Sequence, residues 1–192
     1  SVSATNVCSG GTLTLTGGPA SMTTYAWTGP IGVTFSNAAA QSPTVTIGST
    51  SGTFTLTATN SNGCTASATT ASIVVNARPT TAVLSGTATI CTGSSSNLAV
   101  AITGGSSPYS VVYTGNGGGM VSSYTSGSSI SQTPNATTTY GLTSVTDANG
   151  CTATSPSGAP VITVTNPTIA NGITLSNNDF VWCGTTNGDW TN

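Results

Sequence analysis

The sequence predicts an all-β protein made of two similar small β-sandwich modules followed by a C-terminal strand segment. Threonine is the most abundant residue, and threonine and valine both favour the pleated, half-buried surface of a strand. Short segments alternate apolar and hydroxyl side chains, as half-buried strands do. The same succession of motifs also occurs twice along the 192 residues. These three observations predict tandem β-modules with little or no helix.

The alternation is clearest in three segments of the first half of the chain. In each segment apolar residues stand two apart and threonines lie between them, so one face of the strand is buried and the other faces water. The predicted buried residues are Leu13, Leu15, Val45, Ile47, Phe54 and Leu56.

The repeat becomes visible when "NSNGCTAS" is placed over "DANGCTAT". Each copy then reads cysteine, alternating strand, aromatic strand, alternating strand, Asn-Gly-Cys and closing strand. The matched residues are Cys8 with Cys91, Trp27 with Tyr113, and Cys64 with Cys151. A copy of 80 to 90 residues suits a small β-sandwich (~100 residues in the best-known examples). We therefore predict a module at 1–77, a module at 78–166 and a strand segment at 167–192, with "NARPTT" as the short junction between modules.

The charge content excludes several classes of function. Arg78 is the only basic residue, the acidic residues are Asp147, Asp179 and Asp189, and histidine is absent. General acid/base catalysis and metal ligation need clustered titratable side chains, and nucleic-acid binding needs many cations. Apolar runs such as "LAVAI" fall far short of the ~20 residues that span a membrane. We expect a non-enzymatic chain with no cofactor, no metal, no nucleic-acid partner and no membrane insertion.

The repeated Asn-Gly-Cys motif predicts a turn between two strands. Asn60 or Asp147 can accept a backbone hydrogen bond at the first position of the turn. Gly63 or Gly150 can adopt the left-handed conformation that closes it.

Each module also predicts one disulfide. We expect the cysteine after the turn to bond to the cysteine that opens the same module, pairing Cys8 with Cys64 and Cys91 with Cys151. Each bridge would stabilise its module by about 4 kcal/mol in the chain-entropy description. Free buried thiols and a zinc site are the alternatives, although zinc lacks a histidine to complete a ligand set. Disulfides in turn indicate an oxidising, extracellular or cell-surface location.

The order of cysteine, aromatic strand and "TATNSNGCTAS" or "SVTDANGCTAT" resembles the tandem immunoglobulin-like and PKD-like repeats of secreted Bacteroidota surface proteins. The resemblance covers about residues 1–166 and includes adhesin, gliding and filament proteins. It implies two tandem immunoglobulin-like β-sandwiches with a spacer, adhesive or filament role. It places Trp27 and Tyr113 at the central aromatic of the immunoglobulin-like C-strand, and Phe54 and Tyr140 near the F-strand aromatic.

The two ends of the chain suggest a mode of assembly. Cys183 has no partner in the repeat scheme, and an odd cysteine in a secreted chain suggests an intermolecular bridge or a further module. The first module has a short leading strand, whereas the tail has the shape of a spare one. We expect either head-to-tail self-association, in which residues 167–185 add a strand to the first module of the next subunit, or neighbouring modules of one longer polypeptide.

Two other interpretations remain open at this point. Calcium could bind Asp147 with Asn149, or Asp179 with Asn177 and Asn178, although turn stabilisation explains these side chains as well. Carbohydrate binding is the alternative function, because sugars stack on exposed aromatic rings. Its candidate residues are Tyr113, Tyr124, Trp182 and Trp190.

Overall fold

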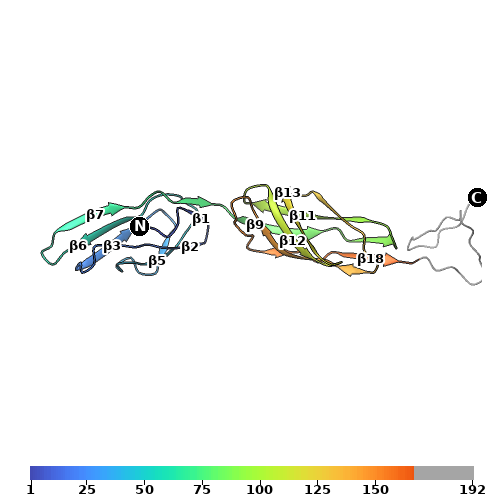
Figure 1. The fold of residues 1–192 in the computed structure, drawn as a ribbon, viewed down its shortest axis with the longest axis horizontal. Coiled ribbons are helices and arrows are strands. Elements are labelled where there is room, and N and C mark those ends of the chain that lie inside the picture. Colours follow the sequence, from blue (N-terminus) through green and yellow to red (C-terminus); the bar gives the residue numbers. More distant parts are fainter. Residues whose placement is uncertain (167–192) are drawn as a thin grey trace, which may run out of the picture. The chain divides into compact units, whose positions relative to one another are not determined.

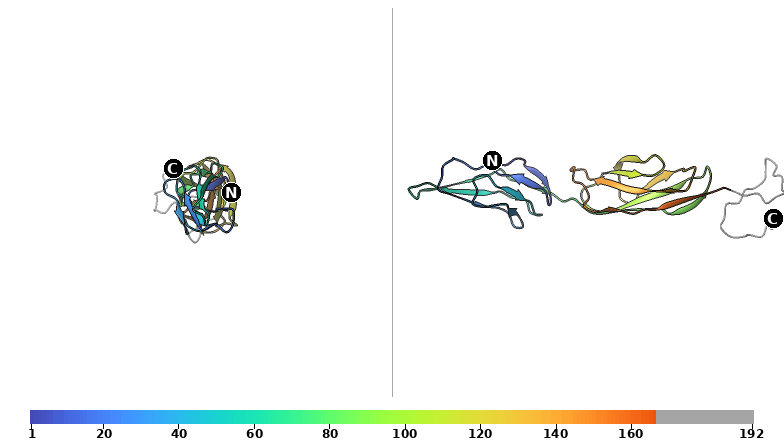
Figure 2. Two further views of the ribbon diagram at one scale, coloured as in Figure 1. Left: turned by 90° about the vertical axis from the view of Figure 1, so that its left-hand side faces the viewer. Right: turned by 90° about the horizontal axis from the view of Figure 1, so that it is seen from below.

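The computed structural model describes residues 1–166 of the chain, and this part is built from strands β1 to β18 (Figure 1). The all-β prediction is confirmed, because no helix is present among the described residues. Within this range, accordingly, no helix is long and apolar enough to cross a membrane. The described residues form two compact units, coloured blue to teal and green to orange in Figure 2.

The first unit contains Ser1–Pro79 together with two short segments from later in the chain, Gly104–Ser106 and Asp147–Thr152. Its strands pair as β1-β8, as β2-β5-β4 and as β3-β6-β7. The strands are β1 (Asn6–Cys8), β2 (Thr12–Thr14), β3 (Thr24–Thr28), β4 (Thr34–Phe35), β5 (Thr44–Thr46), β6 (Thr55–Thr59), β7 (Thr65–Thr69) and β8 (Val74–Asn76).

A single apolar cluster lies between the two three-stranded sheets of the first unit. Residues from β2 and β5 on one side and from β3 and β6 on the other pack into it, which makes the unit a β-sandwich. All six apolar residues of the predicted alternating strands are buried there. Trp27, in β3, joins this core and donates its indole N–H to the backbone oxygens of Ala40 and Gln41.

The second unit contains Thr80–Thr103, Ser107–Thr146 and the chain from Ala153 onward. Its strands pair as β14-β11-β9-β17, as β13-β12-β16 and as β10-β18-β15. The strands are β9 (Pro79–Ser85), β10 (Ala88–Cys91), β11 (Ser96–Gly104), β12 (Tyr109–Thr114), β13 (Gly119–Tyr124), β14 (Ser129–Gln132), β15 (Thr138–Thr139), β16 (Gly141–Thr146), β17 (Pro156–Ser157) and β18 (Val161–Thr165).

The core of the second unit repeats the plan of the first. Apolar residues of β9, β11 and β14 meet those of β12, β13 and β16 in one buried cluster. Tyr113 and Tyr140 belong to this cluster, and their sequence counterparts Trp27 and Phe54 belong to the cluster of the first unit. The aromatic positions matched in the sequence are therefore core positions in both repeats.

One further feature is shared and fixes the position of the leading cysteines. In both repeats the leading strand runs parallel to the closing strand, β1 beside β8 and β10 beside β18. The register sets Cys8 beside Asn76 and Cys91 beside Thr165. Each leading cysteine consequently lies at the carboxyl end of its closing strand.

Candidate functional site: a disulfide at the Asn-Gly-Cys turn

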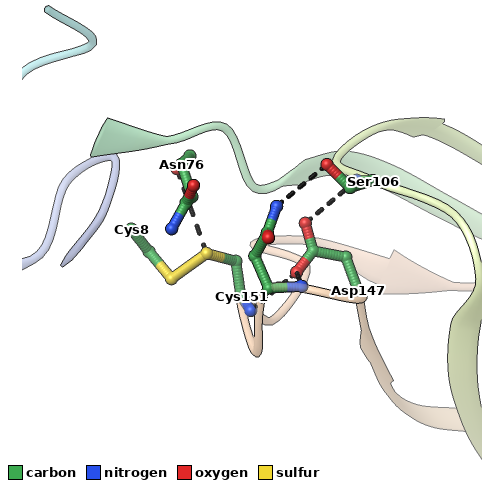
Figure 3. The surroundings of a disulfide bond; sticks show 6 residues. Cys8, Asn76, Ser106, Asp147 and Cys151 are labelled. Carbon is green, nitrogen blue, oxygen red and sulfur yellow. Dashed lines mark hydrogen bonds between the residues drawn. A yellow bond between two sulfur atoms is a disulfide. The ribbon is translucent and has the colours of Figure 1, made fainter. Parts of the chain in front are cut away.

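The most distinctive site of the chain is a disulfide between Cys8 and Cys151, residues separated by 143 positions in the sequence (Figure 3). Their Cα atoms are 5.6 Å apart, within the usual range for a disulfide. The bond links the leading strand of the first sequence repeat to the Asn-Gly-Cys turn of the second. Both cysteines lie in the first compact unit, because that unit includes Asp147–Thr152.

This bond corrects the predicted pairing within each repeat. Cys8 is not bonded to Cys64, which is an exposed free thiol. Cys91 is not bonded to Cys151, since the sulfur of Cys151 is already used, although Cys91 is itself disulfide-bonded. The prediction of disulfides was right in kind, but it assigned the wrong partners.

The physical reason lies in the direction of the strands in the first unit. Cys64 precedes β7, and the chain then runs largely extended through β7 and β8 to Asn76, beside which Cys8 lies. Twelve residues separate positions 64 and 76, which corresponds to about 40 Å at roughly 3.3 Å per residue. Figure 1 accordingly shows β7 and β1 toward opposite ends of this unit. Two cysteines so far apart cannot bond, because a disulfide needs Cα atoms within about 7 Å.

Asp147 organises the turn that presents Cys151. Its side chain is only 6 % exposed, and its carboxylate accepts three backbone N–H groups. Oδ1 accepts from Asn149 at 3.0 Å and from Cys151 at 2.8 Å, and Oδ2 accepts from Ser106 at 3.0 Å. Three such donors balance the cost of burying a carboxylate, and hydrogen bonds to a charged acceptor are about twice as strong as neutral ones. Oδ1 holds the turn and Oδ2 binds the neighbouring loop at Ser106, so this carboxylate has a structural role.

The loop at Gly104–Ser106 completes the surroundings of the disulfide. The Ser106 backbone oxygen accepts from Ala148 N at 2.9 Å, and its hydroxyl accepts from the Asn149 side-chain amide at 2.9 Å. Gly105 has φ of +70°, and a Cβ at this position would lie 2.8 Å from Pro79 Cγ. A side chain is thus excluded both by the backbone conformation and by the proline ring.

The backbone beside the disulfide is held in place as well. Asn76 lies next to the sulfur atoms, with its backbone oxygen 3.9 Å from the Sγ of Cys151, and it accepts a hydrogen bond from Ser9 N at 2.9 Å. Figure 3 shows this strand end and the Asp147 turn on either side of the bond. Sequence reasoning missed Asn76, Gly105 and Ser106. The signal that could have found the loop is the Gly-Gly pair, which occurs at corresponding places in the two repeats as Gly17–Gly18 and Gly104–Gly105.

The first repeat contains the same turn around its own cysteine. The Asn60 side-chain oxygen accepts from Asn62 N at 2.9 Å and from Cys64 N at 3.0 Å, and Asn60 N donates to the Cys64 oxygen at 3.0 Å. Gly63 has φ of +81°, and Gly150 has φ of +80°. The two Asn-Gly-Cys turns therefore have the same geometry, and they differ in that Cys151 is buried and bonded whereas Cys64 is exposed and free.

The candidate sugar platforms within the described residues do not lie on the surface. Tyr113 and Tyr124 are 8 % and 3 % exposed. The Tyr113 hydroxyl accepts from the Gln132 side chain at 2.9 Å, and the Tyr124 hydroxyl donates to Ser128 O at 2.6 Å. These two residues cannot stack on a sugar in this structure. Carbohydrate binding itself stays a prediction, because Trp182 and Trp190 lie outside the described residues.

Other predicted residues fall in that same part of the chain. Cys183, the possible calcium ligands around Asp179 and the whole segment 167–192 lie outside the described residues. Within residues 1–166, no group of three or more histidine, cysteine or acidic side chains is placed to hold a metal ion. One core group has a perturbed titration: burial raises the pKa of the Tyr140 hydroxyl, and the neighbouring Tyr113 adds to the shift.

Comparisons with known proteins show only low similarity to solved structures. No protein-family model and no curated protein matches the chain. Among solved structures, murine CEACAM1b is 13 % identical over 86 % of this chain and 97 % of its own, with a TM-score of 0.38. The fibronectin(III)-like modules of Clostridium thermocellum CbhA are 12 % identical over 84 % and 89 %, with a TM-score of 0.40. A 1.5-MDa bacterial ice-binding adhesin is 14 % identical over 84 % of this chain and 60 % of its own, with a TM-score of 0.37.

The predicted fold class is confirmed. The described chain is all-β, and each of its two units is a β-sandwich. The immunoglobulin-like assignment within that class stays a prediction. One part of the fold prediction is wrong, since the disulfide of Cys8 does not close the first sequence repeat on itself but reaches the turn of the second.

Proposed function

We propose that this chain is a non-enzymatic structural element of an extracellular fibre or adhesin, in which tandem immunoglobulin-like modules act as a spacer. The observation that carries the proposal is the Cys8–Cys151 disulfide. A bond across 143 sequence positions prevents the chain between these residues from being pulled out while the bond is intact. Disulfides persist in oxidising compartments, which supports a secreted or surface location.

The near absence of charge supports the same proposal. The whole sequence has one basic and three acidic residues. Ion pairs can contribute little to the stability of contacts between such modules. Salt and pH, which act through charged groups, should therefore change the strength of these contacts little. A surface structure exposed to changing surroundings benefits from that insensitivity. The same composition is poor material for catalysis, which needs titratable groups near one another.

Head-to-tail assembly by strand addition is the finer part of the proposal. In the second unit the edge of β11 is covered by the seven-residue strand β9. In the first unit the corresponding edge of β2 meets, among the residues that the structure describes, only Ser1–Ser3, through the Val2–Leu15 bridge and hydrogen bonds of Ser1 and Ser3. Such an edge can accept a strand from another subunit or from a neighbouring module. The donor that we propose, residues 167–185, lies outside the described part of the chain.

The location is tested by immunogold labelling of intact source cells with an antibody raised against residues 1–166. We expect labelling on the outer surface and along fibres, with the cysteine pair 8 and 151 oxidised in protein released by protease. A chain found only inside cells, with both thiols reduced, would overturn the proposal. Membership in the Bacteroidota surface repeats stays a prediction that the identity of those source cells would test.

Assembly is tested separately by sedimentation velocity and negative-stain microscopy of the full chain. We expect oligomers or filaments at high protein concentration that persist from low to molar salt. A chain that stays strictly monomeric at high concentration would remove head-to-tail association, and assemblies that dissolve in molar salt would contradict the argument from low charge.

A further inference from the structure

The free thiol of Cys64 lies in a site whose counterpart in the second repeat is already occupied. Cys64 and Cys151 follow the same Asn-Gly-Cys turn, with the same two hydrogen bonds from the turn backbone to an Asx side-chain oxygen. Cys151 is bonded to Cys8, the cysteine of a leading strand. The leading-strand cysteine of the second repeat, Cys91, is disulfide-bonded as well. Among the described cysteines, those of the leading strands and of the Asn-Gly-Cys turns are therefore all in disulfides except Cys64.

We propose that Cys64 receives a disulfide from the leading-strand cysteine of another module of this type that precedes the first repeat. This inference adds a partner to the proposed structural function. It rests on that function only in assuming that the modules occur in tandem. It assigns to Cys64 a partner of stated chemistry: a cysteine that ends a leading strand and lies beside the carboxyl end of a closing strand, as Cys8 lies beside Asn76.

The glycine pairs that correspond in the two repeats differ in how closely other atoms pack against them. Next to Cys151, Gly105 lies against Pro79, with a Cβ position only 2.8 Å from the proline ring. Its counterpart in the first repeat, Gly18, has no atom of the described residues within 4 Å of the corresponding position. The space that Pro79 fills beside Gly105 is thus open beside Gly18.

The same difference is seen at the Asx side chain. Asp147 uses its second carboxylate oxygen to accept from Ser106 N, and this contact holds the Gly-Gly loop against the turn. Within residues 1–166 the side chain of Asn60 makes the two turn hydrogen bonds and no contact of this second kind. Beyond the turn, all five residues of β7 are exposed, from Thr65 to Thr69. The turn, the loop and the thiol of the first repeat are therefore accessible together.

The partner is a preceding module rather than a second copy of this chain joined through the same residue. Two Asn-Gly-Cys turns facing each other would repeat neither the Cys8–Cys151 pairing nor the packing of Pro79 on Gly105. Formation of the bond joins the two Sγ atoms, releases two protons and transfers two electrons. The oxidant is a second disulfide, such as a low-molecular-weight one, which is reduced to two thiols by exchange.

The test extends the 192-residue chain at its start with a further copy of residues 1–83. The junction preserves the spacing of the chain, because fifteen positions separate Asn76 from Cys91, and the extended chain keeps the same fifteen between Asn76 of the added copy and Cys8. The added copy carries Cys64→Ser, which removes its own free thiol. It also carries Ala4→Ser at an exposed position, which distinguishes its Cys8 peptide by mass.

The readout is alkylation of thiols followed by non-reducing peptide mapping after refolding in a glutathione redox buffer. Pepsin is suitable, because the single basic residue, Arg78, is followed by proline and so offers trypsin no efficient cleavage site, and because acid prevents exchange. We expect Cys64 to change from fully alkylated in the natural chain to unlabelled in the extended one, in a peptide joined to the mass-marked Cys8. The matched control is the same extension with Cys8→Ser in the added copy, in which Cys64 should again be fully alkylated.

Two results would overturn the inference. One is a Cys64 that stays alkylated in the extended chain while the natural Cys8–Cys151 link is found intact, since the link shows that the chain has folded. The other is a disulfide-linked dimer of the natural chain through Cys64, which would assign the partner to a second copy. Neither result depends on where the protein is located in the cell, so failure here is distinguishable from failure of the proposed function.

Discussion

Mechanical extension is the measurement most sensitive to the Cys8–Cys151 bond. We consider a chain pulled between handles at Ser1 and at Ser155, an exposed position shortly after the turn. With the bond intact, the covalent path between the handles contains residues 1–8 and 151–155, and its contour length is about 40 Å at roughly 3.4 Å per residue. Reduction adds the 143 positions between the two cysteines, or about 490 Å at the same ~3.4 Å per residue. After subtraction of the 5.6 Å that the bond already spans, the expected gain is about 480 Å.

The assay is single-molecule force spectroscopy of the full chain with handles that contain no thiol, before and after addition of a phosphine reductant. We expect no unfolding step longer than about 40 Å before reduction and a total gain of about 480 Å after it. Cys64→Ser should give the same result, because Cys64 is a free thiol. An oxidised chain that releases several hundred ångströms before reduction would refute the assigned pairing.

The remaining predictions concern the turn and the core. Asp147→Ala should lower the free energy of unfolding by about 2 kcal/mol in urea denaturation, because three backbone N–H groups lose their acceptor, whereas Asp147→Asn should cost less, since it can keep the two bonds to Oδ1. Gly105→Ala should cost about 2 kcal/mol through its positive φ and the contact with the proline ring, and Gly18→Ala, with open space around it, is the control that should be near neutral. Tyr140→Phe should leave stability unchanged or raise it by about 1 kcal/mol in thermal unfolding, because the buried hydroxyl has no hydrogen-bond partner within residues 1–166. Because the pKa of Tyr140 is raised, the folded state retains a proton that the unfolded state loses above pH ~10. The free energy of unfolding should therefore be unaffected by this group below pH ~10 and fall above it. Tyr140→Phe should lack this part of the loss.

Local patterns predicted the strands and the core because burial on one face of a strand imposes a two-residue period. Leu13 and Leu15, for example, alternate with threonines in the sequence and are 4 % and 0 % exposed in the structure. The aromatic positions followed from the repeat, since Trp27 and Tyr113 align and are both buried. These inferences needed only residues close together in the chain.

The cysteine pairing could not be predicted in the same way, because it depends on which ends of strands meet. The sequence shows that Cys8 and Cys64 belong to one repeat, but it does not show that β1 runs parallel to β8. That parallel pairing carries Cys8 to the carboxyl end of the closing strand, away from the turn of its own repeat. The three-residue strand β1 is too short to reveal its partner from its composition.

The parallel pairing of leading and closing strands has a consequence for a chain under tension after the disulfide is lost. In both repeats the entering and leaving segments belong to strands that point the same way, β1 with β8 and β10 with β18. A force applied to the amino end of one and the carboxyl end of the other slides the strands along each other, and the hydrogen bonds of the ladder share the load instead of opening one by one. In each repeat the hydrogen bonds of this parallel strand pair therefore resist extension by shear, without any covalent bond.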